Sequence, residues 1–193
     1  EAYRNGTITK ELLAIRRFSF TLEAFGRDPN SIEIIRLSQQ MSDYYVQEGT
    51  RQTGLMPGAR QLLQWLYEQR QLYRLAVITN GFSEAQLPKM HTAGIDKYFD
   101  HFFLSENLGF MKPDPQFFDA ALSQMNAAPE QCLVIGDDYK VDILGAIKAS
   151  IPQVWYNYTS QTLPTDVQKP TYTIRHLDKL KYILNTNTPK NNL

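Results

Sequence analysis

Two short segments contain residue types that could bind a phosphate group. The first consists of Thr79, Asn80 and Gly81, which offer a hydroxyl group and backbone amides next to a glycine. The second is a proline-rich loop with Lys112, whose ammonium group is a compact positive charge. A hydroxyl, free amides and an ammonium together suit the charge that spreads over phosphoryl oxygens. Taken singly, each segment is also ordinary turn chemistry, because glycine, asparagine and proline are turn residues.

An acidic cluster later in the chain could bind a divalent cation beside that anion. Asp137 and Asp138 follow Gly136, and Asp142 comes one helical turn later. Mg²⁺ takes oxygen ligands and usually only one or two carboxylates, which leaves positions for water and a phosphate oxygen. The cluster therefore suits an oxyanion that is bound together with Mg²⁺. The alternative is that Asp137 or Asp138 is only the N-cap of the helix that follows.

The elements around these segments predict an α/β fold. From residue 57 onward, helical periodicity alternates with short apolar runs, which are typical of strands covered on both faces. This alternation indicates a doubly wound, Rossmann-like parallel sheet, in which ligands bind beyond the C-terminal ends of the strands. Both the threonine segment and the acidic cluster follow such strands. The strands are predicted at residues 75–79, 101–104, 131–135, 153–156 and 171–174, and helices at 59–69, 83–93, 115–125, 141–149 and 176–184.

The first fifty residues are predicted to contain helices only. Apolar residues recur at steps of three and four until Gly26, where the first helix should end. Asp28 as N-cap and Pro29 at the first helical position should start the next helix. Two such helices cannot bury both of their faces alone, so we expect them to form an inserted cap. The predicted domains are a helical cap over residues 1–54, an α/β core over 55–184 and a frayed polar tail over 185–193.

Length and composition exclude several classes of protein. The chain has 193 residues, of which 42% are hydrophobic, as in ordinary globular proteins. The 20 basic and 20 acidic residues balance, which argues against a nucleic-acid polymer as partner. No apolar run could span a bilayer and no secretory signal is visible, so we expect a cytoplasmic protein without a membrane partner. The single cysteine, Cys132, excludes a disulfide framework and is expected to be a core residue, not a nucleophile.

The three polar segments resemble motifs two, three and four of the haloacid dehalogenase (HAD) superfamily, in the order that the family has them. The likeness covers roughly residues 57–172, and runs such as 105–109 and 142–146 are similar to the branch that contains pyrimidine 5′-nucleotidases. That branch has a helical cap between its first and second motifs, which matches the cap predicted here. The resemblance implies a Mg²⁺-dependent phosphatase whose substrate is a small phosphomonoester, with a nucleoside 5′-monophosphate as the expected class.

The resemblance also implies roles for the phosphate-binding residues. Thr79 would donate a hydrogen bond to the phosphoryl group, helped by the backbone amides of Asn80 and Gly81. Lys112 would neutralise the charge of the phosphate and of the nucleophile. Thr79 and Lys112 are therefore the expected catalytic residues of this chain.

The acidic residues acquire their roles from the same resemblance. Asp137 would bind Mg²⁺, directly or through water. Asp142 would hold Lys112 or a metal-bound water, and Asp138 is the less certain neighbour in the same cluster.

The family's first motif has no counterpart in this sequence. That motif, Asp-x-Asp-x-Thr, provides the nucleophilic aspartate and the general acid–base, whereas no two aspartates here are two positions apart. In the family its strand lies between the strands that end in Thr79 and Asp137, so we expect a sheet that lacks its central first strand and has unpaired edges. An N-terminal segment or another chain would complete the sheet and bring the nucleophile. Residues 1–193 alone are expected to be inactive.

Other functions share part of this pattern. A haloacid dehalogenase needs no metal, and the acidic cluster argues against it. Sugar phosphate mutases have the same motifs and stay open. A signalling receiver domain has its acidic pair before the threonine and lysine, whereas here the acidic pair comes last. A non-catalytic binding or scaffold protein also stays open for the chain as written.

Overall fold

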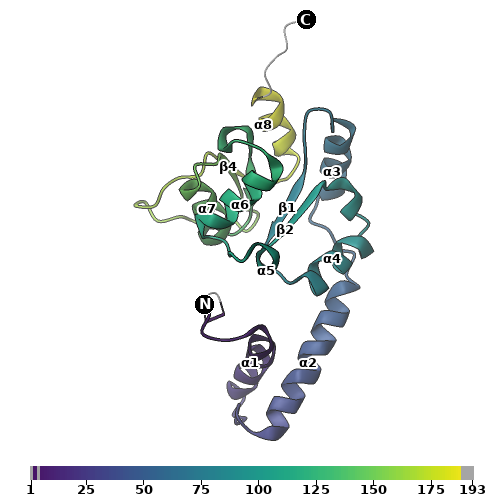
Figure 1. Cartoon of the computed structure of the whole chain (residues 1–193), viewed down its shortest axis with the longest axis vertical. Coiled ribbons are helices and arrows are strands. Elements are labelled where there is room, and N and C mark those ends of the chain that lie inside the picture. Colours follow the sequence, from purple (N-terminus) through teal and green to yellow (C-terminus); the bar gives the residue numbers. More distant parts are fainter. Residues whose placement is uncertain (1, 4, 188–193) are drawn as a thin grey trace, which may run out of the picture. The chain divides into compact units, whose positions relative to one another are not determined.

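The computed structural model describes residues 2–3 and 5–187, and the chain divides into two compact units. The first unit contains Glu1–Thr53 together with Glu84–Ala93, and the second contains Gly54–Ser83 together with Gly94–Leu193. Figure 1 shows their helices and strands along the chain. The sequence did not lead us to expect residues 84–93 in the first unit. Among the described residues, no helix is both long and apolar enough to cross a membrane.

The first unit is built on two helices that pack against each other, α1 (Lys10–Glu23) and α2 (Ile32–Thr50). A third helix, α4 (Ser83–Thr92), belongs to this unit except for its first residue. Lys10 of α1 forms an ion pair with Glu84 of α4 at 2.6 Å. The side chains buried within α1 and α2 are those of Ile34 and three serines, Ser19, Ser38 and Ser42.

The predicted start of the second helix is wrong by three residues. Ser31, not Asp28, is the N-cap of α2, because its hydroxyl accepts a hydrogen bond from the amide of Ile34 at 3.3 Å. The Asp28 carboxylate instead accepts a hydrogen bond from the amide of Asn30 at 3.0 Å, which closes a turn before the helix.

The second unit contains five parallel strands in two separate sheets. Strands β1 (Ala76–Thr79) and β2 (His101–Leu104) pair with Thr79 beside Leu104. Strands β3 (Val134–Gly136), β4 (Gln153–Tyr156) and β5 (Tyr172–Ile174) form the second sheet in that order. All the pairings are parallel, which confirms the predicted α/β class. Within the part of the chain that the structure describes, the edges of β1 and β3 that lie away from β2 and β4 have no strand partner.

Helices cover both sheets of this unit. Besides the strands, it contains α3 (Ala59–Glu68), α5 (Ser105–Leu108), α6 (Pro115–Met125), α7 (Leu144–Lys148), α8 (Lys179–Asn187), a π-helix (Tyr139–Ile143) and 3₁₀ turns at Asp96–Tyr98 and Pro129–Gln131. The boundaries of α6 agree with the prediction because its signals are local: the Asp114 carboxylate accepts a hydrogen bond from the amide of Gln116, and Pro115 occupies the first helical position.

Several other boundaries differ from the prediction, by up to three residues. The strand expected from residue 131 begins only at Val134, because the 3₁₀ turn at Pro129–Gln131 comes first. The helix expected over 141–149 begins earlier, as the π-helix, before it continues as α7. The last helix was predicted over 176–184 but runs from Lys179 to Asn187, so residues 185–187, which were predicted as tail, are helical. The rest of the predicted tail, 188–193, lies outside the described residues.

Two large apolar cores and a smaller third cluster around Trp155 hold the strands in place. In the first, the buried rings of Phe117 and Phe118 from α6 pack with β2, β3 and α7. In the second, α3 and α8 pack on β4 and β5 around Val154, which is fully buried. Strand β1 is only half-buried along its length, and Ile135 in β3 is 42% exposed. Central strands of a parallel sheet are normally buried on both faces, so β1 and β3 have the exposure of strands at an open edge.

Candidate functional site

Lys112 lies at the place where the ends of β1 and β3 come together. Its ammonium group donates a hydrogen bond to the carbonyl oxygen of Ile78 in β1 at 2.9 Å. It also forms an ion pair with the Asp142 carboxylate at 2.7 Å, in the π-helix that follows β3. The lysine side chain is 8% exposed and the aspartate side chain 11% exposed. The Lys112 ammonium therefore joins the lysine loop to β1 by a hydrogen bond and to the π-helix after β3 by a buried ion pair.

The position of the Asp142 side chain depends on Gly136, the glycine at the end of β3. Its second carboxylate oxygen accepts a hydrogen bond from the amide of Asp138 at 3.2 Å, which ties the π-helix to the loop before it. A Cβ atom placed on Gly136 would lie 2.3 Å from the Cβ atom of Asp142. Only glycine at position 136 lets Asp142 approach the strand end closely enough to reach Lys112.

We therefore expect Gly136→Ala to disrupt this pair. The new methyl group would push Asp142 away, at a cost of about 1–3 kcal/mol in the free energy of unfolding, as other overpacked sites show. Chemical denaturation of the variant and the wild type measures this difference. Gly49→Ala in α2 is the control, since no atom lies within 4 Å of the Cβ position there. An unfolding midpoint for Gly136→Ala equal to that of the wild type would contradict the close approach.

The two neighbouring aspartates have different environments. The Asp138 carboxylate accepts hydrogen bonds from the amides of Lys140 at 2.9 Å and Val141 at 3.0 Å, so Asp138 is the N-cap of the π-helix. The Asp137 carboxylate is exposed and forms no hydrogen bond or ion pair with any residue that the structure describes. The N-cap alternative is thus confirmed for Asp138, and Asp137 keeps a carboxylate that is available to a cation.

The backbone of Asp137 is held by a residue that sequence reasoning missed. The indole nitrogen of Trp155 in β4 donates a hydrogen bond to the carbonyl oxygen of Asp137 at 3.0 Å. Trp155 is 3% exposed, and its ring packs edge-on against Tyr139 with centroids 5.6 Å apart. A buried indole needs an acceptor for its N–H group, and here that acceptor belongs to the acidic loop. No local signal in the sequence indicated this contact.

The segment after β1 closes on itself and on the lysine loop. The Thr79 hydroxyl oxygen accepts a hydrogen bond from the amide of Gly81 at 2.9 Å, so the expectation of a free amide at Gly81 is wrong. The Asn80 side chain forms two hydrogen bonds with the backbone of Lys112, at 2.8 and 2.9 Å. The sequence predicted only a backbone role for Asn80, and its side-chain contact spans 32 positions along the chain.

The donor set fits Mg²⁺ through one carboxylate. Among the residues that the structure describes, no group of three or more His, Cys, Asp or Glu side chains could hold a metal ion. The Asp137 carboxylate is exposed and unpaired within the described part of the chain, whereas Asp142 is already paired with Lys112. Because Mg²⁺ usually binds one or two carboxylates and keeps several waters, Asp137 is compatible with it as a single protein ligand.

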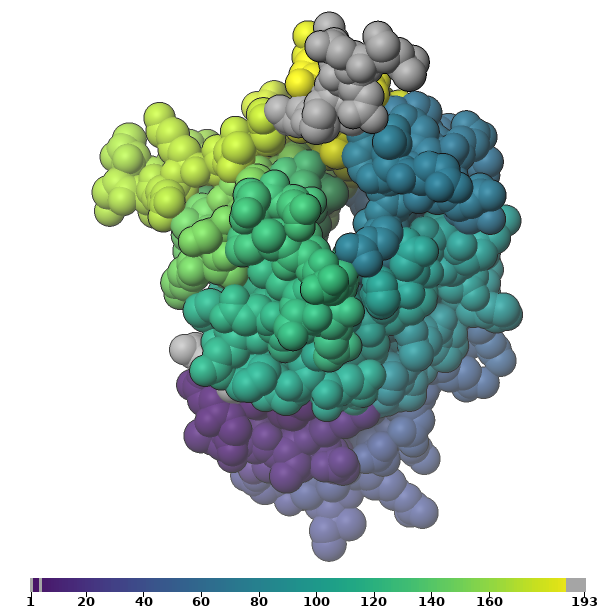
Figure 2. All heavy atoms as spheres, turned by 45° about the horizontal axis from the view of Figure 1, so that its top comes forward, coloured from purple at the N-terminus to yellow at the C-terminus, as the bar shows by residue number. Residues whose placement is uncertain are grey.

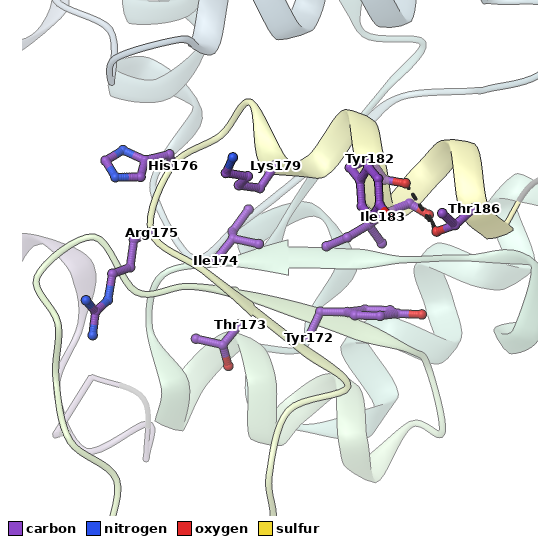
Figure 3. Close-up of a pocket in the computed structure, with 9 residues that line it drawn as sticks. All are labelled: Tyr172, Thr173, Ile174, Arg175, His176, Lys179, Tyr182, Ile183 and Thr186. Atoms are coloured by element: carbon purple, nitrogen blue, oxygen red, sulfur yellow. Dashed lines mark hydrogen bonds between the residues drawn. The ribbon is translucent and has the colours of Figure 1, made fainter.

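Other candidate features lie away from this place. Burial raises the pKa of the Cys132 thiol, which favours its protonated form. A hollow of about 500 Å³ lies between β5 and α8 and includes none of the predicted site residues (Figure 3). Its lining residues, most of them exposed, are Tyr172, Thr173, Ile174, Arg175, His176, Lys179, Tyr182, Ile183 and Thr186.

Comparison with known proteins identifies the family. The family described as haloacid dehalogenase-like hydrolase matches residues 12–150, which is more than half of the chain. The chain belongs to this family. Relatives of this HAD-like hydrolase include HAD-hydrolase YfnB of Bacillus subtilis, 30% identical over 185 residues that cover 95% of this chain and 74% of YfnB. Pyrimidine 5′-nucleotidase YjjG of Escherichia coli is 31% identical over 94% of this chain and 76% of its own length.

Solved structures agree with this assignment. The structure of YfnB, bound to magnesium, superimposes on this HAD-like hydrolase with a TM-score of 0.80 and 28% identity, over 95% of this chain and 76% of YfnB. A 2-haloacid dehalogenase from Pseudomonas syringae superimposes with a TM-score of 0.67 and 27% identity, over 91% of this chain and 71% of that one. The relatives thus include both phosphatases and a dehalogenase, and they support a hydrolase.

Proposed function

We propose that this HAD-like hydrolase is a Mg²⁺-dependent phosphatase that acts on a small phosphomonoester, with a nucleoside 5′-monophosphate as the favoured substrate class. The observation that carries the proposal is the buried ammonium of Lys112, which contacts β1 and the π-helix after β3. Asp137, in the loop between β3 and that π-helix, adds an exposed carboxylate that has no partner among the described residues. Two relatives that match more than 90% of this chain are named pyrimidine 5′-nucleotidases, YjjG and PynA of Streptococcus pneumoniae.

The residues of this chain have distinct tasks in the proposed reaction. Asp142 holds the ammonium of Lys112 in place, and that ammonium offsets negative charge on the phosphoryl group and the nucleophile. Thr79 is the last residue of β1, and its hydroxyl can turn its proton towards a phosphoryl oxygen while its oxygen accepts a hydrogen bond from the amide of Gly81. Asp137 would hold Mg²⁺, which when bound supplies Lewis-acid stabilisation of the charge on the phosphoryl oxygens.

The nucleophile in this proposal comes from a strand that enters between β1 and β3. Both strands have an unpaired edge among the described residues, and both are more exposed than central strands normally are. Figure 2 shows an opening in the second unit between the blue and green parts of its surface. An apolar strand there would be parallel to its neighbours and would bring an aspartate from an N-terminal segment or another chain to Lys112. That aspartate would attack phosphorus, break the ester P–O bond and release the alcohol of the substrate, which leaves an aspartyl-phosphate that water then hydrolyses.

A phosphatase assay on the full-length protein tests the proposal. We expect hydrolysis of one or more nucleoside 5′-monophosphates, loss of turnover with EDTA and recovery with added Mg²⁺. Acid quenching with labelled substrate should trap a phosphoryl group on an aspartate outside residues 1–193. The absence of hydrolysis across a broad panel of phosphomonoesters would contradict the function, and a label on one of the eleven aspartates of this chain would contradict the source of the nucleophile.

Dehalogenation is the second candidate, favoured by one observation. The 2-haloacid dehalogenase from Pseudomonas syringae has a related fold at 27% identity. The chemistry of a haloacid dehalogenase needs no metal, so its activity on a 2-haloacid would persist in EDTA. A non-catalytic scaffold would show neither activity, and equilibrium dialysis with Mg²⁺ and inorganic phosphate separates it from an enzyme that binds both.

A further inference from the structure

We propose that Asn80 is a positioning residue: its side-chain amide holds the backbone of Lys112 and thereby places the ammonium group at the site. This inference rests on the proposed function, since it assigns a cause to the position of Lys112. The family resemblance implies a role for the backbone amide of Asn80. The role proposed here belongs to its side-chain carboxamide, which binds the backbone of Lys112.

The contact is a closed pair of hydrogen bonds. The Asn80 amide nitrogen donates to the carbonyl oxygen of Lys112 at 2.8 Å, and the Lys112 amide donates to the Asn80 amide oxygen at 2.9 Å. One side chain thus satisfies both backbone polar groups of the lysine, as a neighbouring strand would. In the described part of the chain, these are the only hydrogen bonds that the Lys112 backbone makes.

Besides the Asn80 clamp, the backbone of the loop around Lys112 is closed by a turn hydrogen bond from the amide of Asp114 to the carbonyl oxygen of Met111 at 2.9 Å. Lys112 lies between Gly109, which ends α5, and Pro115, where α6 begins, and no strand includes it. The residue is 7% exposed, so water cannot readily replace a lost partner of its backbone. The far end of the side chain is held by Ile78 and Asp142, which leaves Asn80 to hold the near end. Removal of that clamp would let the whole side chain shift relative to β1.

The chemistry of the clamp is specific to a carboxamide. Only a group that donates and accepts from one planar end can pair with the N–H and the C=O of the same residue. An aspartate at position 80 would keep the acceptor but would place a carboxylate oxygen against the carbonyl oxygen of Lys112. Asn80→Asp, which is nearly the same size, therefore removes one hydrogen bond and adds a repulsion, whereas Asn80→Ala removes both bonds.

The chain contains a matched control for this experiment. Asn157 forms the same kind of reciprocal pair with the backbone of Gln161, at 2.9 and 2.8 Å. Asn157 is 6% exposed, and its clamp holds a loop that follows β4. Asn157→Ala therefore reproduces the structural loss without touching the lysine loop.

Kinetics of the full-length protein test the placement of Lys112. With p-nitrophenyl phosphate and Mg²⁺, and well below the unfolding temperature, we expect Asn80→Ala and Asn80→Asp to lower kcat/KM by about 100-fold, as misplacement by 1 Å does elsewhere. Asn157→Ala should lower the melting temperature by a similar amount and leave kcat/KM unchanged. Wild-type kcat/KM in folded Asn80→Ala, in a protein that Lys112→Met inactivates, would overturn the inference while the proposed function stands.

A double-mutant cycle, measured by thermal unfolding, tests the coupling between Asn80 and Lys112 without an activity assay. If Asn80 places Lys112, the fall in melting temperature for Asn80→Ala with Lys112→Met is smaller than the sum of the two single falls. For Asn157→Ala with Lys112→Met, the fall in melting temperature should equal the sum of the two single falls. Additive falls for Asn80 and Lys112 would overturn the inference, and this result is available even if the wild type hydrolyses no phosphomonoester.

Discussion

Lys112→Ala is expected to reduce the phosphatase kcat of the full-length protein by at least about 100-fold and to destabilise the fold. The loss of turnover follows because the variant removes the ammonium that offsets charge on the phosphoryl group, and losing one such group typically costs about 100–1000-fold in kcat. The loss of stability follows because the Asp142 carboxylate, 11% exposed, is left without its partner. Breaking one side of a buried ion pair costs about 3–5 kcal/mol. Steady-state kinetics and chemical denaturation measure the two effects.

A double variant separates these two effects. Lys112→Met with Asp142→Asn replaces both charges by neutral groups of similar size and keeps an acceptor for the amide of Asp138. Neutral replacements of buried pairs are often close to neutral in stability, so the unfolding midpoint should recover. Turnover should stay low, because the ammonium is still absent. Recovery of turnover along with stability would show that Lys112 is only structural.

Asp137→Asn is expected to abolish Mg²⁺-dependent turnover and to leave stability unchanged. Its carboxylate is exposed and has no partner among the described residues, so the variant should lie within about 0.5 kcal/mol of the wild type in the free energy of unfolding. A neutral amide is a much weaker ligand for Mg²⁺ than a carboxylate, so we expect both a higher Mg²⁺ requirement and a kcat lower by about 100-fold or more. A Mg²⁺ titration of activity measures both.

The matched control for this variant is Asp119→Asn. Asp119 is an exposed aspartate on α6, and the substitution makes the same change of charge away from the acidic loop. It should retain the kcat and the Mg²⁺ requirement of the wild type. If Asp137→Asn and Asp119→Asn behave alike, Asp137 does not bind the metal and the assignment of the acidic loop is wrong.

Local signals explain which elements could be predicted. Strand β2 and helix α6 begin and end where the sequence places them, because proline, an N-cap and an apolar run act within a few residues. The start of α2 was wrong because Asp28 and Ser31 are both good N-caps, and local preference does not choose between them. The last helix extends to Asn187 because Leu180 and Ile183 pack in the second core, and packing outweighs the polar composition of its end.

The family, the α/β class and the three candidate segments of the site could be predicted from the sequence, because they depend on residue types and on the order of strands along the chain. How these segments meet depends on the folded chain: Lys112 pairs with Asp142, Asp138 caps a helix while Asp137 has no partner among the described residues, and Asn80 clamps the lysine loop. Each of these is a side-chain hydrogen bond or ion pair. The partner in each such contact is a group that folding brings within about 3 Å. Hydrophobic periodicity and local propensity do not predict which groups come that close.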